Sequence, residues 1–153
     1  MTASNYIGMD EGQLVDVRIE HLLQAIATGD HASCKYDIDS TFNALMHDYI
    51  GSALGYRINV LAVLKDGNHD IIAIASAMHF TVTFTFPSAH DWPFGGFPWA
   101  PNATAAASIR PLHGEFTEYS PGVDIPAAFF AALLEYMRRV SSVMLNQPTL
   151  LHS

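Results

Sequence analysis

The sequence predicts an α+β fold in which several strands precede one C-terminal amphipathic helix. Side chains alternate between large and small over residues 71–86, which is the spacing of a β-strand. Near the C-terminus, Phe129, Leu133 and Val140 recur at the spacing of one helix face. A chain of 153 residues has the length of one domain with its own core, so we expect a single domain over residues 1–153.

The first element fits both the two-residue period of a strand and the period of a helix, about 3.6 residues. Apolar and charged residues alternate from Leu14 to Glu20, which favours a strand. The spacing of Leu14, Val17, Leu22 and Ile26 also fits one face of a helix. We expect a strand, ended by the turn signal at Gly29.

Four further strands are expected along the middle of the chain. They cover residues 36–42, 56–65 and 71–86, followed by a short strand within 109–119. The segment 71–86 is longer than the usual strand of about 3–10 residues, so we expect a bend or bulge near Ser76.

The final helix has local start and stop signals. Asp124 and Pro126 are typical of a helix N-terminus. Asn146 is a plausible left-handed stop, and Pro148 cannot donate the hydrogen bond that a continuing helix needs. We therefore expect the helix to end near Leu145.

The composition indicates surplus apolar surface. The chain is 50% hydrophobic but only 14% charged, against a typical charged share of about a quarter. Such a surplus is typical of subunit interfaces or a binding groove, and a deep single core is the alternative.

Net charge and sequence patterns indicate which classes of partner and which cellular compartment to expect. A net charge of −8 opposes binding to phosphate backbones, so we expect no nucleic-acid partner. No apolar run is long enough for membrane insertion, and residues 1–12 are polar and acidic, unlike a secretion signal. The single Cys34 cannot form an internal disulfide, which agrees with a reducing compartment. These patterns predict a cytoplasmic protein.

No catalytic or cofactor motif is present in the sequence. The eight histidines are scattered, and the pair His31 and Cys34 lacks the further ligands that would make a zinc site specific. The sequence contains no nucleophile elbow, no phosphate-binding loop and no dinucleotide fingerprint. We therefore expect no metal, no cofactor and no enzymatic activity.

An aromatic segment follows the longest predicted strand. Residues 87–102 contain four prolines and two glycines, so they cannot form a regular element. The segment either folds back onto the body or binds a partner. Its large aromatic side chains are Trp92, Phe94, Phe97 and Trp99.

The C-terminal part of the chain resembles the SecB family of export chaperones. The matching features are Pro126-Ala127, Phe129-Phe130, Leu133, Glu135, a helix of matching length, and Pro148-Thr149-Leu150-Leu151. The family motif has a proline and an arginine where this chain has only apolar residues around Ala131 and Ala132. The chain stops at Ser153 without the family's tail, so docking to the translocation motor is in doubt.

The resemblance implies an antiparallel four-stranded sheet with the C-terminal helix packed on it, assembled as a dimer of dimers. It implies an ATP-independent holdase that binds unfolded polypeptides in apolar grooves and along strand edges. The expected peptide-binding residues are Met78, Phe80, Val82, Phe84, Trp92, Phe94, Phe97 and Trp99. The expected oligomer-interface residues are Phe129, Leu133, Met137, Val140 and Met144.

Two other classes of function remain open. A structural or assembly protein of viral or mobile-element origin would have one closed symmetric interface and no open groove. A small α+β enzyme would have a cavity between sheet and helix, with His79 or His113 as the base.

Overall fold

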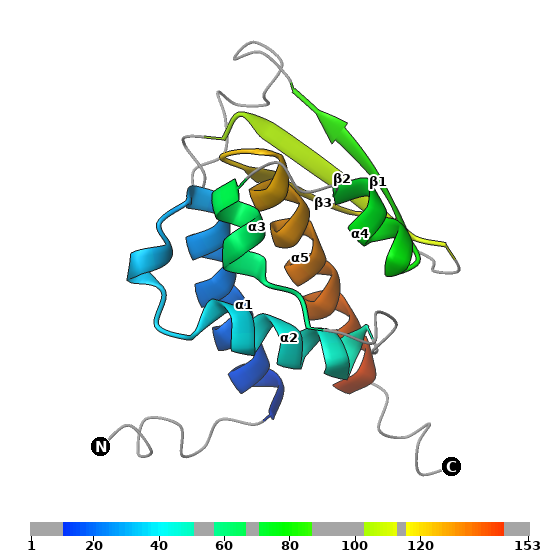
Figure 1. Cartoon of the computed structure of the whole chain (residues 1–153). Helices are drawn as coiled ribbons and strands as arrows, with labels where there is room; N and C mark the ends of the chain where they lie inside the picture. Colours follow the sequence, from blue (N-terminus) through cyan, green and yellow to red (C-terminus); the bar gives the residue numbers. More distant parts are fainter. Residues whose placement is uncertain (1–10, 51–56, 67–70, 87–102, 113–115, 146–153) are drawn as a thin grey trace, which may run out of the picture.

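The computed structural model of the chain describes residues 11–50, 57–66, 71–86, 103–112 and 116–145. The elements in order are α1 (Glu11–Thr28), the short 3-10 helix η2 (His31–Ser33), α2 (Ile38–Tyr49), α3 (Val60–Asp66), α4 (Ile71–Ala77), β1 (Phe80–Thr85), β2 (Ala105–Pro111), β3 (Glu118–Gly122) and α5 (Ile125–Leu145). The strands form one antiparallel sheet in the order β1-β2-β3. Helix α5 packs on this sheet and also contacts α1, α2 and α3, so it lies at the centre of the molecule (Figure 1).

The predicted C-terminal helix is confirmed, with its start at the predicted signal. The Ala127 backbone N–H donates a hydrogen bond of 2.9 Å to Asp124 Oδ1, which satisfies one of the free amides of the first turn. Pro126 lies in the same turn, where its missing N–H has no helical partner to lose.

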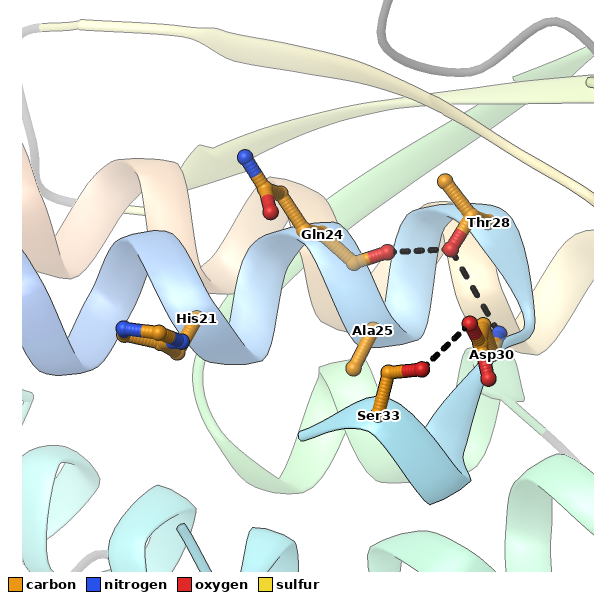
Figure 2. Close-up of a pocket in the computed structure, with 6 residues that line it drawn as sticks. All are labelled: His21, Gln24, Ala25, Thr28, Asp30 and Ser33. Carbon is orange, nitrogen blue, oxygen red and sulfur yellow. Dashed lines mark hydrogen bonds between the residues drawn. The ribbon is translucent and has the colours of Figure 1, made fainter. Parts of the chain in front are cut away.

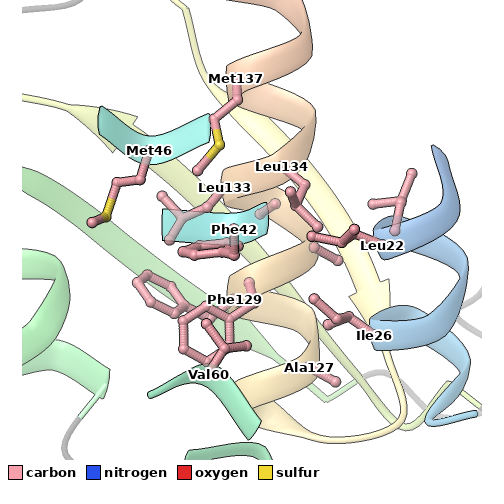
Figure 3. Close-up of a cluster of buried hydrophobic side chains, with 14 of the residues drawn as sticks. Leu22, Ile26, Phe42, Met46, Val60, Ala127, Phe129, Leu133, Leu134 and Met137 are labelled. Carbon is pink, nitrogen blue, oxygen red and sulfur yellow. The ribbon is translucent and has the colours of Figure 1, made fainter. Parts of the chain in front are cut away.

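The first half of α5 is buried on every side. All side chains from Pro126 to Leu134 are buried, so this half has no polar face and differs from the amphipathic helix expected. Figure 3 shows residues of four helices meeting around it, namely Leu22, Ile26, Phe42, Met46, Val60, Ala127, Phe129, Leu133, Leu134 and Met137. The rings of Phe42 and Phe130 meet edge to face, with their centroids 5.3 Å apart. The core is therefore built around α5.

The strand expected at Leu14 to Glu20 is wrong, because these residues belong to α1. Leu22 and Ile26 of the helical alternative are buried, and Val15 and Ile19 complete the buried face of the helix. Helix α1 packs along α5, so this contact selects the helical period over the alternation.

The strand expected at residues 36–42 is also wrong, because α2 begins at Ile38. Asp37 caps this helix, since its Oδ2 atom accepts a 2.9 Å hydrogen bond from the Ser40 backbone N–H. The buried side chains of α2 are Ile38, Phe42, Leu45 and Met46, which lie on one helical face. Asp37 and the polar residues that follow it therefore form a helix cap and the first turn of α2.

The strand expected at residues 56–65 is wrong, and the strand expected at residues 71–86 is correct only in its second half. Within 56–65, residues 57–59 are irregular and the helix α3 begins at Val60. Within 71–86, the first half forms α4 and only the second half forms β1. The bend expected near Ser76 is replaced by a change from helix to strand at Met78 and His79, where His79 has φ = +64°.

The sheet of the described residues has three strands where four were expected. The single strand expected within 109–119 covers the end of β2 and the start of β3. These two strands pair in antiparallel register, with Ile109 opposite Glu118 and Ala105 opposite Gly122. The α+β class and the packing of the C-terminal helix on the sheet are thus confirmed, but the strand count is not.

We expect His79→Gly to stabilise the protein by about 1 kcal/mol, because an L-residue at positive φ is strained and glycine is not. His79→Ala is the matched control, since it removes the imidazole but keeps the strain. Urea unfolding of both variants measures the difference. Equal stability of the glycine and alanine variants would contradict this account of the turn.

We expect Gly122→Ala to destabilise the protein by about 1–3 kcal/mol, because the end of β3 touches the start of α5. A Cβ atom at position 122 would lie 2.3 Å from the Ala128 backbone nitrogen and 2.7 Å from its Cα. Thermal unfolding checks this, with Ser108→Ala on the neighbouring strand as control. A melting temperature equal to that of the wild type would refute the close approach.

Candidate functional site

Strand β1 is an edge of the sheet, since it pairs with β2 and with no other strand of the described chain (Figure 1). The Leu112 backbone N–H donates to the His79 carbonyl oxygen at 2.9 Å, which makes these two residues a hydrogen-bonded pair. Such pairs alternate along an antiparallel ladder, so Thr81 and Thr83 also direct their backbone groups at β2. The N–H and C=O groups of Val82 and Phe84 therefore point away from the sheet.

The sequence of β1 itself has none of the charged or strand-breaking residues that prevent strand addition. Its sequence, Phe-Thr-Val-Thr-Phe-Thr, has no charge, no proline and no glycine. The opposite edge strand, β3, has a charged side chain at Glu118 and a proline at Pro121. Glu118 lies opposite the buried Ile109 and so faces the helical side, where inward charges disfavour pairing with another sheet. Of the two edges, β1 is the one open to another strand.

The α5-facing side of β1 becomes more exposed along the strand. Phe80 is buried, and its ring meets Tyr136 of α5 at a centroid distance of 5.1 Å. Val82 and Phe84 follow on the same side and are half-buried, and Phe86 just beyond the strand is 64% exposed. The edge thus combines free backbone groups with partly uncovered apolar side chains.

The structure separates the expected peptide-binding residues into three groups. Met78 and Phe80 are buried and belong to the core. Val82 and Phe84 lie at the open edge, half-buried. The aromatic residues Trp92, Phe94, Phe97 and Trp99 lie outside the described residues.

The expected interface residues also differ in burial. Phe129, Leu133 and Met137 are fully buried within the chain, so their side chains are not available to a second copy in this fold. Val140 is half-buried and Met144 is 52% exposed. Contact of these last two residues with another subunit stays a prediction.

Sequence reasoning missed a group of ion pairs between α5 and its neighbours. Arg138 bridges Glu20 of α1 at 2.8 Å and Glu135 at 2.6 Å. Arg139 contacts Glu118 of β3, and its guanidinium lies 4.9 Å from the centroid of the Phe116 ring. The only signal was the Arg138-Arg139 pair itself, which the helix dipole explains equally well.

The carboxyl group of Glu118 has a raised pKa. Its side chain is 12% exposed, and burial raises its pKa, although Arg139 opposes the shift. Among the described residues, its Oε1 atom touches Arg139 without hydrogen-bond geometry. A raised carboxyl pKa means that folding favours the protonated form of the side chain. The protein therefore becomes less stable as the pH rises through the pKa that Glu118 has in the folded state.

We expect the stability of Glu118→Gln, relative to the wild type, to increase from about pH 4 to about pH 7. The wild type must hold a desolvated charge at the higher pH, and the glutamine variant does not. Urea unfolding across this range measures the difference between the two proteins. A difference that stays constant or falls with pH would refute the burial effect.

Two surface hollows offer no catalytic arrangement. The first, of about 250 Å³, lies where α1 ends and is lined by His21, Gln24, Ala25, Thr28, Asp30 and Ser33 (Figure 2). Its polar groups bond one another, as when Ser33 Oγ donates to Asp30 Oδ2 at 2.6 Å and Thr28 Oγ1 donates to the Gln24 carbonyl. The second, of about 570 Å³, is a groove between α1 and α2 with mixed polar and apolar walls.

Of the two bases proposed for the enzyme alternative, only His79 lies within the described residues. His79 is exposed at the turn into β1 and lines neither of the two hollows. His113 falls outside the described residues. Within the described ranges, no three His, Cys, Asp or Glu side chains are grouped as metal ligands. None of the helices in those ranges has the length and apolar character needed to cross a membrane.

Comparison with protein-family models, with curated proteins and with solved structures gave no match to this chain.

Proposed function

We propose that this protein is an ATP-independent, non-catalytic holdase of the cytoplasm that binds unfolded polypeptides along the β1 edge. The observation that carries the proposal is an edge strand with free backbone groups and no charge or proline, beside half-buried Val82 and Phe84. The SecB-like features of the C-terminal helix are the second support, and the dimer of dimers they imply belongs to the same proposal.

An extended client would add as a strand beside β1. The N–H and C=O groups of Val82 and Phe84 would bond the client backbone irrespective of its sequence, which suits a protein with many clients. Alternate client side chains would lie against Val82, Phe84 and Phe86, where each Å² of buried apolar surface contributes about 25 cal/mol. This binding needs no nucleotide.

The charge distribution supports the same mode of binding. The chain carries a net charge of −8, yet β1 itself is uncharged. Apolar segments therefore meet no charged group on the strand, while repulsion between the acidic bodies helps to keep loaded complexes in solution.

The proposal is tested by light scattering of a chemically denatured client, with and without the protein and in the absence of nucleotide. Suppressed scattering at stoichiometric amounts is the expected result. If several unrelated clients aggregate at the same rate with and without the protein, the holdase function is refuted.

The variant Phe86→Ser tests whether clients bind at the end of β1. The substitution should weaken binding of a fluorescent apolar peptide at least roughly tenfold, since burying a phenylalanine contributes about 1.5–3 kcal/mol. Because Phe86 is exposed, the unfolding midpoint should stay unchanged. Leu112→Ser is the matched control, since Leu112 is also exposed but lies beyond the end of β2. An equal loss of peptide affinity in both variants would show that β1 is not the binding edge.

A further inference from the structure

We propose that the β1 edge also binds a second copy of this chain, through an antiparallel β1–β1 pair whose two-fold axis passes through Thr83. The pairing would join two three-stranded sheets into one continuous sheet. It rests on the edge geometry and on the strand's own sequence, and it does not require the holdase function.

The pleat of β1 restricts the possible registers. Phe80, Val82 and Phe84 share the α5-facing side, and Thr81, Thr83 and Thr85 share the other. In a continuous sheet, directly opposite residues lie on the same side, so apolar residues must oppose apolar residues and threonines must oppose threonines. An antiparallel pair of identical strands meets this condition only when the two-fold axis passes through a residue.

The free backbone groups favour the axis at Thr83. In this register Val82 lies opposite the partner's Phe84, and Phe80 lies opposite the partner's Phe86. These are the residues whose N–H and C=O groups alternate away from β2, so each pair exchanges two hydrogen bonds. The axis at Thr83 opposes all of residues 80–86, whereas an axis at Val82 places Thr85 and Phe86 opposite the turn residues His79 and Met78 and so covers less apolar surface.

The side chains of the strand suit a copy of itself. Thr81 meets the partner's Thr85, and Thr83 meets the partner's Thr83, which are favourable cross-strand pairs. No charged residue of β1 meets its like, although each chain carries a net charge of −8. Phe86, which is 64% exposed in the single chain, gains an aromatic neighbour in the partner's Phe80.

The opposite edge does not offer this pairing. Strand β3 would bring Glu118 close to a like charge or an apolar residue of another sheet, and Pro121 has no N–H to donate. The sheet therefore extends at β1 only, which gives a closed two-fold dimer instead of an open filament. Self-pairing and client binding use the same edge, so a client must displace the second copy.

Cysteine cross-linking tests both the dimer and its register, in a Cys34→Ser background that removes the natural thiol. Thr83→Cys places two thiols directly opposite each other in a non-hydrogen-bonded pair, where the Cα atoms are about 4.5 Å apart and a disulfide can form. Near-complete oxidation to a covalent dimer is expected at concentrations where the protein is dimeric.

Thr81→Cys and Thr85→Cys are the matched controls. Each should stay monomeric alone under the same oxidation, because its own copy is offset by four residues, about 13 Å. An equimolar mixture of the two should form a cross-linked heterodimer, since these positions oppose each other. Cross-linking of Thr81→Cys alone, or no cross-linking of Thr83→Cys, overturns the proposed register.

Sedimentation gives the oligomeric state directly. The wild type should sediment as a dimer of the 16.7 kDa chain or as a pair of such dimers, and folded Val82→Pro should sediment with half the wild-type mass. The proline removes an N–H that points away from β2, so the β1–β2 ladder is kept. If this variant unfolds, the cross-linking pattern still decides the question.

The outcomes separate the two proposals. A wild-type monomer that suppresses aggregation refutes the β1–β1 dimer and the dimer of dimers, and it leaves the holdase activity itself in place. A dimer with the expected cross-links that suppresses no aggregation supports the self-pairing and refutes the holdase function.

Discussion

The burial of the first half of α5 is the constraint on which the rest of the structure depends. A helix that is apolar on all sides must be covered on all sides, and no single neighbour can do this. The sheet covers one side, and α1, with contributions from α2 and α3, covers the other. The small residues Ala127, Ala128, Ala131 and Ala132 allow these neighbours to approach closely, and Gly122 gives β3 the same freedom at the start of the helix.

This central position also explains the uneven burial of the sheet. Helix α5 packs on β2 and β3, and β1 is covered on that side mainly by the short helix α4 and by contacts such as Phe80 with Tyr136. Burial therefore decreases from Phe80 through Val82 and Phe84 to Phe86. The edge farthest from the centre of the core is the one with apolar side chains left uncovered.

The two edges of the sheet differ in chemistry as well as in cover. At β3, Glu118 forms an ion pair with Arg139 on α5. The charge that disfavours strand addition at this edge is therefore fixed by a contact with the central helix. At β1 there is no charge, and the threonines on the outer side are compatible with water and with another strand alike. The client binding and the self-association that we propose both rest on this one uncharged edge.

The sequence by itself determined the features whose causes lie within a few residues. The start of α5 was predictable because the Asp124 cap and Pro126 act on the adjacent turn, and the α+β class followed from that helix and the alternation at Phe80 to Thr85. The alternation at Leu14 to Glu20 fitted both periods, and the packing of α1 against α5 selected the helix. Residues 71–77 were expected as part of a strand, but they form α4, which packs on β1. The candidate site was predictable only for Val82 and Phe84. Which strand is outermost, and which carboxylate faces Arg139, are set by contacts between distant parts of the chain. Arg138 and Glu20, which bond across 118 positions, illustrate the reason: the tertiary structure decides such pairings because no local pattern records which segments will be neighbours.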